Sequence, residues 1–423
     1  MGLKQWPIAP MTQLSDLIRI FGRIGLLSFG GPAAQIALMH RELVEERPWL
    51  SETEFLRALS FCMLLPGPEA MQLATYAGWK QRGIIGGLIG GGLFVLPGAI
   101  VIMALALLYG QFGALDWVQA VFLGVKATVV VIVIQAILRL SKKALKLKVH
   151  WLLALGAFVC LYIFALPFPL VIAVAAIVGG AFCTTSEDAP KVSINWRTPL
   201  MVIMIGGILW GLPILLVGDG LLRDIGVFFS KLAVVTFGGA YAVLAYMTQD
   251  VVANYGWLST DQMMDALGLA ETTPGPLILV TQFVAVVAGT NAGLSGVAAG
   301  LMALWVTFVP CFIWIFAGAP LIDWLASRPR LSAALAGVTA SVVGVIANLS
   351  VWFALHLFFG SAQTITFGPA HFILPKAASL DPNALGLALF AGFLLLRKSY
   401  GLPVVLGLTG GASWLVHFVI ATT

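Results

Sequence analysis

The sequence predicts an all-α polytopic membrane protein made of two antiparallel, inverted-topology homologous repeats, with about 13 transmembrane segments that include short or broken helices. The first observation is composition: of 423 residues, 60% are hydrophobic and 10% charged, with a mean hydropathy of +1.00. The second is a pair of repeated motifs. Phe29-Gly30-Gly31-Pro32 returns 208 residues later as Phe237-Gly238-Gly239-Ala240, and Pro66-Gly67-Pro68 returns as Pro274-Gly275-Pro276. Helix breakers at matching places in two hydrophobic halves point to the binding site of a membrane transporter.

The predicted spans follow from apolar runs of roughly 20 residues. They lie near residues 14–39, 55–78, 84–109, 117–139, 150–165, 167–183, 199–218, 225–249, 262–289, 294–316, 332–358, 384–397 and 400–421. This order divides the chain into an N-terminal repeat (1–190), a connector helix (191–222) and a C-terminal repeat (223–423). The last two helices of each repeat are short, and they either cross the membrane or re-enter it.

Basic residues predict the orientation. A cytoplasmic N-terminus places on the cytoplasmic side most of the Lys and Arg residues in the connections: Lys80, Arg82, Lys142, Lys143, Lys146, Lys148, Lys191, Arg197, Arg328, Arg330, Arg397 and Lys398. Arg41, Arg47, Arg223 and Lys376 are expected outside. This excess follows the positive-inside rule, so the formal charge of +5 reflects topology rather than nucleic-acid binding. No secretory signal peptide is evident at the N-terminus.

Cysteine and histidine usage gives no sign of a metal site or a cofactor. Cys62, Cys160, Cys183 and Cys311 lie in or beside apolar runs without CxxC spacing, and the five histidines are scattered. We therefore expect small buried thiols rather than metal ligands or disulfides.

The repeat extends beyond the two motifs. Ser51 with Glu54, and Ser259 with Gln262, each have the spacing of a helix-capping box. After the second Pro-Gly-Pro the offset grows to 213 because about five residues are inserted, and Lys126 then has Thr339 as its counterpart.

The breaks are candidate anion sites. A broken helix exposes backbone N–H groups, and these together with the helix dipole favour an anion in a cavity. The alternative is that the glycines and prolines only allow close packing and kinks. The candidate substrate-binding residues are Gly30, Gly31, Pro32, Pro66, Gly67, Pro68, Gln72, Lys126, Gly238, Gly239, Thr273, Pro274, Gly275 and Pro276.

Charged residues inside apolar runs form a second set of candidates. Lys126 needs a partner in the membrane, which is either an oxyanion or a carboxylate such as Glu69 or Glu271. These two acids are candidates for proton coupling. Arg23 and Lys231 occupy matching repeat positions and either act on the substrate or extend to the interface.

The motifs resemble the chromate ion transporter family in its long-chain, two-domain form. The residues that carry the resemblance are Phe29-Gly30-Gly31-Pro32, Leu65-Pro66-Gly67-Pro68-Glu69-Ala70, Phe94-Val95-Leu96-Pro97-Gly98, Thr236-Phe237-Gly238-Gly239 and Glu271-Thr272-Thr273-Pro274-Gly275-Pro276. The resemblance implies antiparallel homologous halves, a location in the bacterial cytoplasmic (inner) membrane, and export of chromate that confers resistance. Sulfate is the implied competitor. Ala240 departs from the pattern, because the first copy has Pro32 there.

The predicted function is therefore secondary transport of a divalent oxyanion, without an enzymatic reaction and without ATP, since no GxxxxGK[ST] motif is present. The alternatives are a transporter of sulfate or another tetrahedral oxyanion, an anion channel, and an intramembrane reductase, which would need haem-type histidines or clustered cysteines. A homodimer is one assembly that the sequence leaves open.

Overall fold

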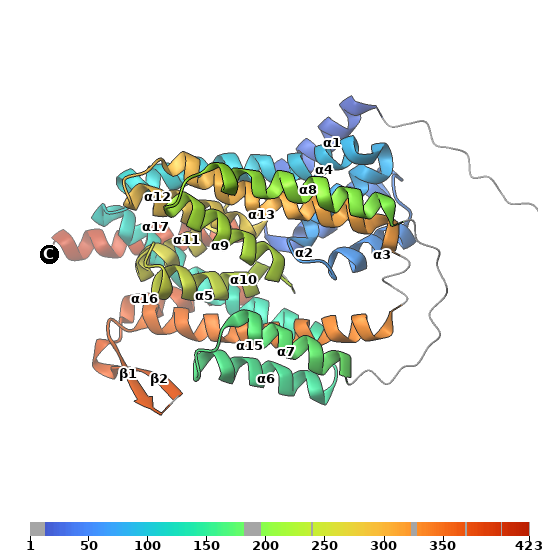
Figure 1. Ribbon diagram of the computed structural model, residues 1–423. Helices are drawn as coiled ribbons and strands as arrows, with labels where there is room; N and C mark the ends of the chain where they lie inside the picture. Colours follow the sequence, from blue (N-terminus) through green and yellow to red (C-terminus); the bar gives the residue numbers. More distant parts are fainter. Residues whose placement is uncertain are drawn as a thin grey trace, which may run out of the picture.

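The computed structural model describes residues 13–181, 196–237, 240–322, 328–368, 370–398 and 400–422, and it is dominated by helices that run along one axis (Figure 1). The elements up to the connector are α1 (Leu14–Leu27), α2 (Gly31–His40), η1 (Arg41–Glu45), α3 (Glu52–Cys62), α4 (Glu69–Phe112), α5 (Asp116–Ala144), α6 (Lys148–Tyr162), α7 (Phe168–Ala181) and the connector helix α8 (Arg197–Leu216). The described chain is mainly helical, which is consistent with the all-α prediction.

The elements after the connector follow in a similar order. They are α9 (Leu221–Val235), α10 (Ala240–Gln249), η2 (Asp250–Asn254), α11 (Thr260–Thr272), η3 (Leu277–Leu279), α12 (Val280–Asn291), α13 (Gly296–Gly318), η4 (Ala319–Leu321), α15 (Pro329–Phe358), β1 (Ala362–Phe367), β2 (Ala370–Pro375), η5 (Ala377–Ser379), α16 (Pro382–Gly392), η6 (Phe393–Arg397) and α17 (Leu402–Thr422). Both predicted capping boxes are present, at the starts of α3 and α11. A short π-helix follows both α2 and α10.

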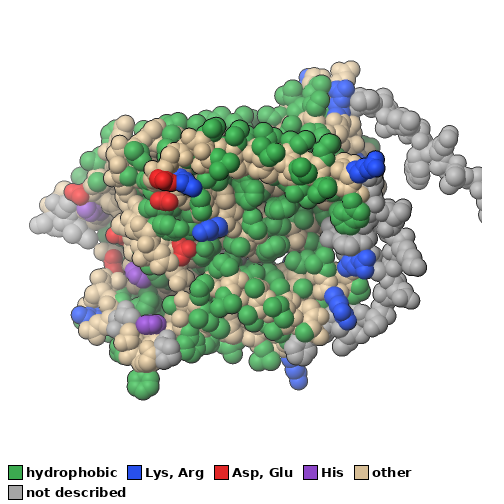
Figure 2. Space-filling view, in the orientation of Figure 1, with side chains coloured by type: hydrophobic (Ala, Val, Ile, Leu, Met, Phe, Trp, Pro, Cys, Tyr) green, Lys and Arg blue, Asp and Glu red, His purple; other side chains and the backbone are tan. Residues whose placement is uncertain are grey.

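Six helices in the described part of the chain are long and apolar enough to cross a membrane. They are Glu69–Phe112, Asp116–Ala144, Arg197–Leu216, Gly296–Leu321, Pro329–Phe358 and Leu402–Val419. Hydrophobic side chains cover most of the visible face of the molecule (Figure 2). The chain is therefore a multi-pass membrane protein.

Helix α4 is two helices joined by a sharp reversal. Arg82 and Gly83 have non-helical backbone angles, and the chain then doubles back so that a Cβ on Gly78 would lie 2.1 Å from the carbonyl oxygen of Gly86. Glycine at both positions lets the two backbones touch. Residues 69–81 and 84–112 are thus separate segments, as the sequence predicts.

The second and ninth predicted spans are hairpins rather than continuous crossings. After the break at Pro66-Gly67-Pro68, segment 69–81 returns to the start of α3, where Lys80 lies 3.3 Å from Glu54. In the second half α12 returns to the start of α11, where the Asn291 amide donates to the carbonyl of Trp257 at 3.1 Å. Each hairpin begins and ends at the same end of the bundle.

The first and eighth predicted spans also fold back at their breaks. Arg23 on α1 lies 3.4 Å from Glu42, which follows α2, and Phe228 on α9 contacts the ring of Tyr246 on α10. The sequence predicts these four segments as broken spans that cross the membrane, whereas the chain folds back at each break. Apolar length alone does not distinguish a crossing from a hairpin of two half-length helices.

The two hairpins that contain Pro-Gly-Pro approach the middle of segment 84–112 from opposite ends. Gly86, near the start of this segment, contacts the first hairpin, and Gly110, near its end, lies beside Thr290 of the second. At the middle, a Cβ on Gly98 would lie 2.2 Å from the carbonyl oxygen of Pro274. Cys311 on α13 occupies the position of Gly98 in the second repeat. Its sulfur would lie 2.8 Å from a Cβ on Gly67.

The last helices of each half pack mainly on the long helix of the other half. Helices α6 and α7 lie on α15, and α16 and α17 lie on α5. At one such contact Thr128 and Thr409 share a hydrogen bond of 2.8 Å. The β1–β2 hairpin, which the sequence analysis did not predict, sits over the α6–α7 turn, where the His371 amide donates to the Ile163 carbonyl at 2.7 Å.

Gly98→Ala tests the contact at the middle of the bundle. The added methyl group collides with the Pro274 carbonyl, so we expect a loss of about 1–3 kcal/mol of stability, visible as a lower melting temperature in detergent. Gly92→Ala is the control, because it adds the same methyl group to the same helix with no atom within 4 Å. Equal melting temperatures for the two variants would contradict the close approach.

Candidate functional site

A cavity of about 290 Å³ lies at the tip of the first hairpin. Its polar lining residues come from four places in the chain and are Glu69, Lys143, Lys146, His150 and Thr339. Dividing its volume by about 30 Å³ per water gives space for roughly ten waters, enough for a small hydrated anion.

The electrostatics of this cavity favour negative charge, because its two lysines outnumber its one acid, Glu69, among the described lining residues. Two lysine side chains line it, and the Lys143 ammonium lies 3.6 Å from the sulfur of Met63 at the end of α3. The N-terminus of segment 69–81 begins at the cavity with Glu69, so the positive end of its helix dipole lies there too. Nδ1 of His150 is buried and has no hydrogen-bond partner among the described residues.

The glycine amide of each Pro-Gly-Pro break donates a hydrogen bond to the backbone of the other half. The amide of Gly67 donates to the carbonyl of Thr236 at 2.8 Å, and that of Gly275 donates to the carbonyl of Ser28 at 2.9 Å. Both glycines have positive φ, +119° and +88°. In this state these two N–H groups are therefore not directed at a ligand.

Neighbouring polar side chains reinforce the breaks. Buried Gln72 donates to the carbonyl of Pro66 at 2.7 Å, while Gln35 donates to the carbonyls of Gly275 at 2.7 Å and Ser28 at 3.2 Å. The hydroxyl of Thr273 donates to the carbonyl of Ala270 within α11. In this state Gln72 and Thr273 support the backbone at the breaks.

The Phe-Gly-Gly-Pro break also has the predicted form. Gly30 and Gly31 have φ of +85° and +77°, and Pro32 lies in the first turn of α2. Gly238 and Gly239, the matching candidates in the second half, lie outside the described residues.

Lys126 pairs with an acid that the sequence analysis missed. Its ammonium lies 3.3 Å from Asp265 and 3.7 Å from the exposed Asp261, both on α11. Tyr109 and Gln119 donate to the second oxygen of Asp265 at 2.7 and 3.4 Å. Asp265 stands in the apolar run of α11, and that intramembrane charge was the signal available in the sequence.

The remaining charged candidates do not join one site. Arg23 is half-exposed and paired with buried Glu42, and Lys231 is exposed on α9. Glu69 is at the cavity, whereas Glu271 is buried at the end of α11 in the other hairpin. The lysines at the cavity entered the sequence analysis only as topology signals, because their approach to Glu69 depends on how α5 packs on the first hairpin.

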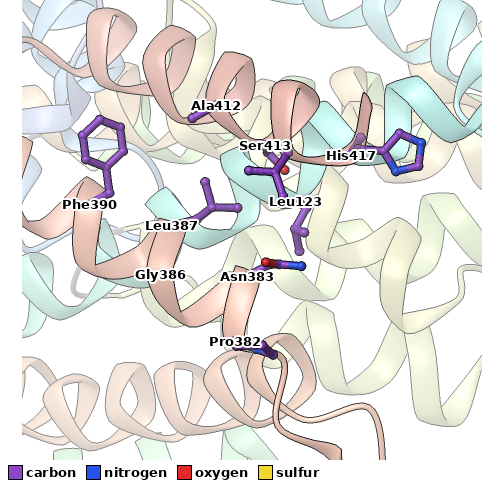
Figure 3. Close-up of a pocket in the computed structure, with 11 residues that line it drawn as sticks. Leu123, Pro382, Asn383, Gly386, Leu387, Phe390, Ala412, Ser413 and His417 are labelled. Carbon is purple, nitrogen blue, oxygen red and sulfur yellow. The ribbon is translucent and has the colours of Figure 1, made fainter. Parts of the chain in front are cut away.

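A second pocket, of about 390 Å³, lies between α5, α16 and α17 (Figure 3). Apolar side chains such as Leu123, Leu387 and Phe390 line it, with Ser413 and His417 on one side. Among the described residues its lining includes no lysine or arginine, so it does not share the anion-favouring character of the first cavity.

Comparison with known proteins identifies the family. The sequence matches the chromate transporter family over residues 15–180 and 223–414. The chain belongs to this family. Relatives include a probable chromate transport protein of Synechococcus elongatus, 32% identical over 81% of this chain and 85% of its own, and a chromate transport protein of Cupriavidus metallidurans, 32% identical over 80% and 82%. A chromate transport protein of Pseudomonas aeruginosa is 29% identical over 97% and 94%. No solved structure matches this chromate transporter family member.

Gly67→Ala tests whether the first break must keep its backbone geometry. A Cβ there would lie 2.8 Å from the Cys311 sulfur and would occupy a φ of +119°, so we expect most substrate transport to be lost along with about 1–3 kcal/mol of stability. Gly83→Ala is the control for positive φ, since a Cβ at that glycine meets no atom within 4 Å. Transport assays on purified, correctly inserted variants decide, and normal transport by Gly67→Ala would make the break a simple packing kink.

Proposed function

We propose that this chain is a secondary transporter that exports chromate from the cytoplasm and thereby confers chromate resistance. The observation that carries the proposal is the cavity at the first Pro-Gly-Pro, where two lysines and a helix N-terminus meet. Chromate is a tetrahedral dianion, and membership in the chromate transporter family supports it as the substrate.

The orientation follows from the basic residues. We call the end of the bundle that carries the 80–83 reversal and the α5–α6 turn the basic end, and the end that carries the 113–115 and 292–295 turns the acidic end. Arg41 and Arg47, which the sequence analysis expected outside, pair with the same Glu46 just before α3 and lie at the basic end, as the Glu54–Lys80 contact shows. The positive-inside rule then assigns the basic end to the cytoplasm, and with it α1 and the N-terminus. A bacterial inner membrane is the corresponding location.

The two halves act as an inverted repeat in this proposal. A two-fold axis in the membrane plane would produce two kinds of contact that support this proposal. The hairpins approach the centre from opposite ends, and the glycine amides of the two halves form reciprocal hydrogen bonds there. The proposed units are residues 1–190 and 223–423, with α8 crossing between them to bring the second half in from the opposite side.

The closed centre favours a carrier over a channel. Gln72, Thr236 and Gln282 around the breaks are almost fully buried, while the cavity lies on the cytoplasmic side of them. A carrier exposes its site to one side at a time, and the state described here is open toward the basic end.

The membrane potential supplies enough energy for export. Moving two negative charges out of a negative-inside cell yields about 4.6 kcal/mol per 100 mV, twice the value of about 2.3 kcal/mol for one charge. Proton coupling through Glu69 is compatible with its place in the cavity, but the potential alone provides enough free energy for export.

The second candidate is transport of sulfate or another tetrahedral oxyanion through the same cavity. The lysines recognise charge, and no group in the described lining distinguishes chromate from sulfate. Sulfate is accordingly proposed as a competitor.

Proteoliposomes test the function directly. We expect saturable chromate uptake into inside-out vesicles, inhibited by sulfate and accelerated by a positive-inside potential imposed at constant pH. Molybdate and sulfate fluxes are measured in parallel. Sulfate flux without chromate flux would reassign the substrate, and flux that rises linearly with concentration would support a channel.

Lys143→Gln combined with Lys146→Gln tests the cavity. Removing two ammonium groups that interact with the dianion should raise the KM for chromate by at least tenfold, since one charge-assisted hydrogen bond contributes about 1.5–3 kcal/mol. Lys142→Gln with Lys148→Gln is the matched control, because these neighbouring lysines have the same charge but do not line the cavity. Equal KM values for the two double variants would exclude a specific role for the cavity lysines.

A further inference from the structure

Lys126 lies at the position in the repeat that corresponds to a residue of the cytoplasmic cavity. Its counterpart at an offset of 213 is Thr339, which lines that cavity on α15. Lys126 itself is only 7% exposed and lies on α5, whose first turns are at the acidic end. The repeat therefore places Lys126 where a second cavity would form if the acidic end opened and the basic end closed.

The partner of Lys126 occupies the space that an anion would need. Asp265 is fully buried, and it presents one oxygen to the Lys126 ammonium and the other to the Tyr109 hydroxyl. A tetrahedral dianion offers the same kind of oxygen acceptors as this carboxylate. Asp265 is thus an internal substitute for an anion in the present state.

A purely structural role explains this arrangement less well. Two buried charges are costly to desolvate, and hydrophobic residues of similar volume often stabilise a core equally well. The counterparts of Lys126 and Asp265 in the other half are Thr339 and Arg57, so the fold does not require this ion pair at both related places.

From these observations, and resting on the oxyanion transport proposed above, we propose that Lys126 binds the dianion when the acidic end is open and that Asp265 then displaces it. The anion leaves as the carboxylate returns to the ammonium, so that Asp265 acts as a positioning residue that promotes release. The cytoplasmic cavity differs in its balance of charge, since its described lining has two lysines and one acid, Glu69.

The two members of the pair should therefore affect substrate affinity in opposite directions. Asp265→Asn removes the buried competitor and leaves only the exposed Asp261 beside the ammonium. We expect it to lower the KM for chromate measured from the acidic end by roughly tenfold, while slowing net export. Lys126→Gln removes the ligand and should raise the same KM, with Lys126→Arg retaining part of the affinity. KM is measured by counterflow from each side of proteoliposomes of uniform orientation.

Several results would overturn the proposal. A structural ion pair predicts that both substitutions weaken transport alike, because either one breaks the pair, and unchanged KM values would also exclude the role. If Lys126→Gln fails to fold, the sign of the Asp265→Asn effect decides. The exchanged variant Lys126→Asp with Asp265→Lys keeps the charge pair, and we expect it to fold without normal transport, whereas full transport would show that only the pair matters.

The controls separate this inference from the proposed function. Wild-type protein that carries sulfate but not chromate would reassign the substrate, and the comparison of the two sides would then use sulfate. Wild-type protein that carries neither would overturn both proposals.

Discussion

Two reciprocal hydrogen bonds at the centre of the bundle constrain the rest of the structure. The amide of Gly67 donates to Thr236, and the amide of Gly275 donates to Ser28, each across the boundary between the halves. Proline has no N–H group, so the glycine carries the only donor of each tripeptide. An unpaired buried amide would cost about 1–3 kcal/mol. Each half therefore satisfies the break of the other, and neither completes its backbone bonding alone.

This constraint accounts for the small residues around the breaks. The hairpin tips can reach the centre only where segment 84–112 and α13 present little bulk, as Gly98 does to Pro274. The same tight contact closes the middle of the protein, while the cavity remains on one side of it. Because the two hairpin tips make similar contacts at the centre, either tip could move away while the other keeps the centre closed. This arrangement suits a carrier that opens alternately to the two sides of the membrane.

The sequence was informative where local chemistry decides the structure. Helix caps at Ser51 and Ser259 and the breaks at Gly30, Gly67 and Gly275 follow from the backbone preferences of those residues, and all are present. The hairpins were missed because two short apolar helices in sequence have the same hydropathy as one long crossing. The ion pair of Lys126 with Asp265 was also missed, since it joins residues 139 positions apart and depends on the packing of α11 against α5.

The differences between the halves bear most directly on the direction of transport. A perfectly symmetric carrier would offer equivalent sites to the two sides, and only the gradients would set the direction of flux. Here the cavity at the basic end has two lysines beside Glu69, whereas at the acidic end the ammonium of Lys126 is already neutralised by Asp265. In the proposed direction of export, an anion would bind more strongly at the basic end, where it enters, and meet a competing carboxylate at the acidic end, where it leaves. A passive carrier cannot change the equilibrium distribution of the anion across the membrane. This asymmetry therefore changes the transport rate and the half-saturation concentration measured from each side, while the free energy for export still comes from the membrane potential.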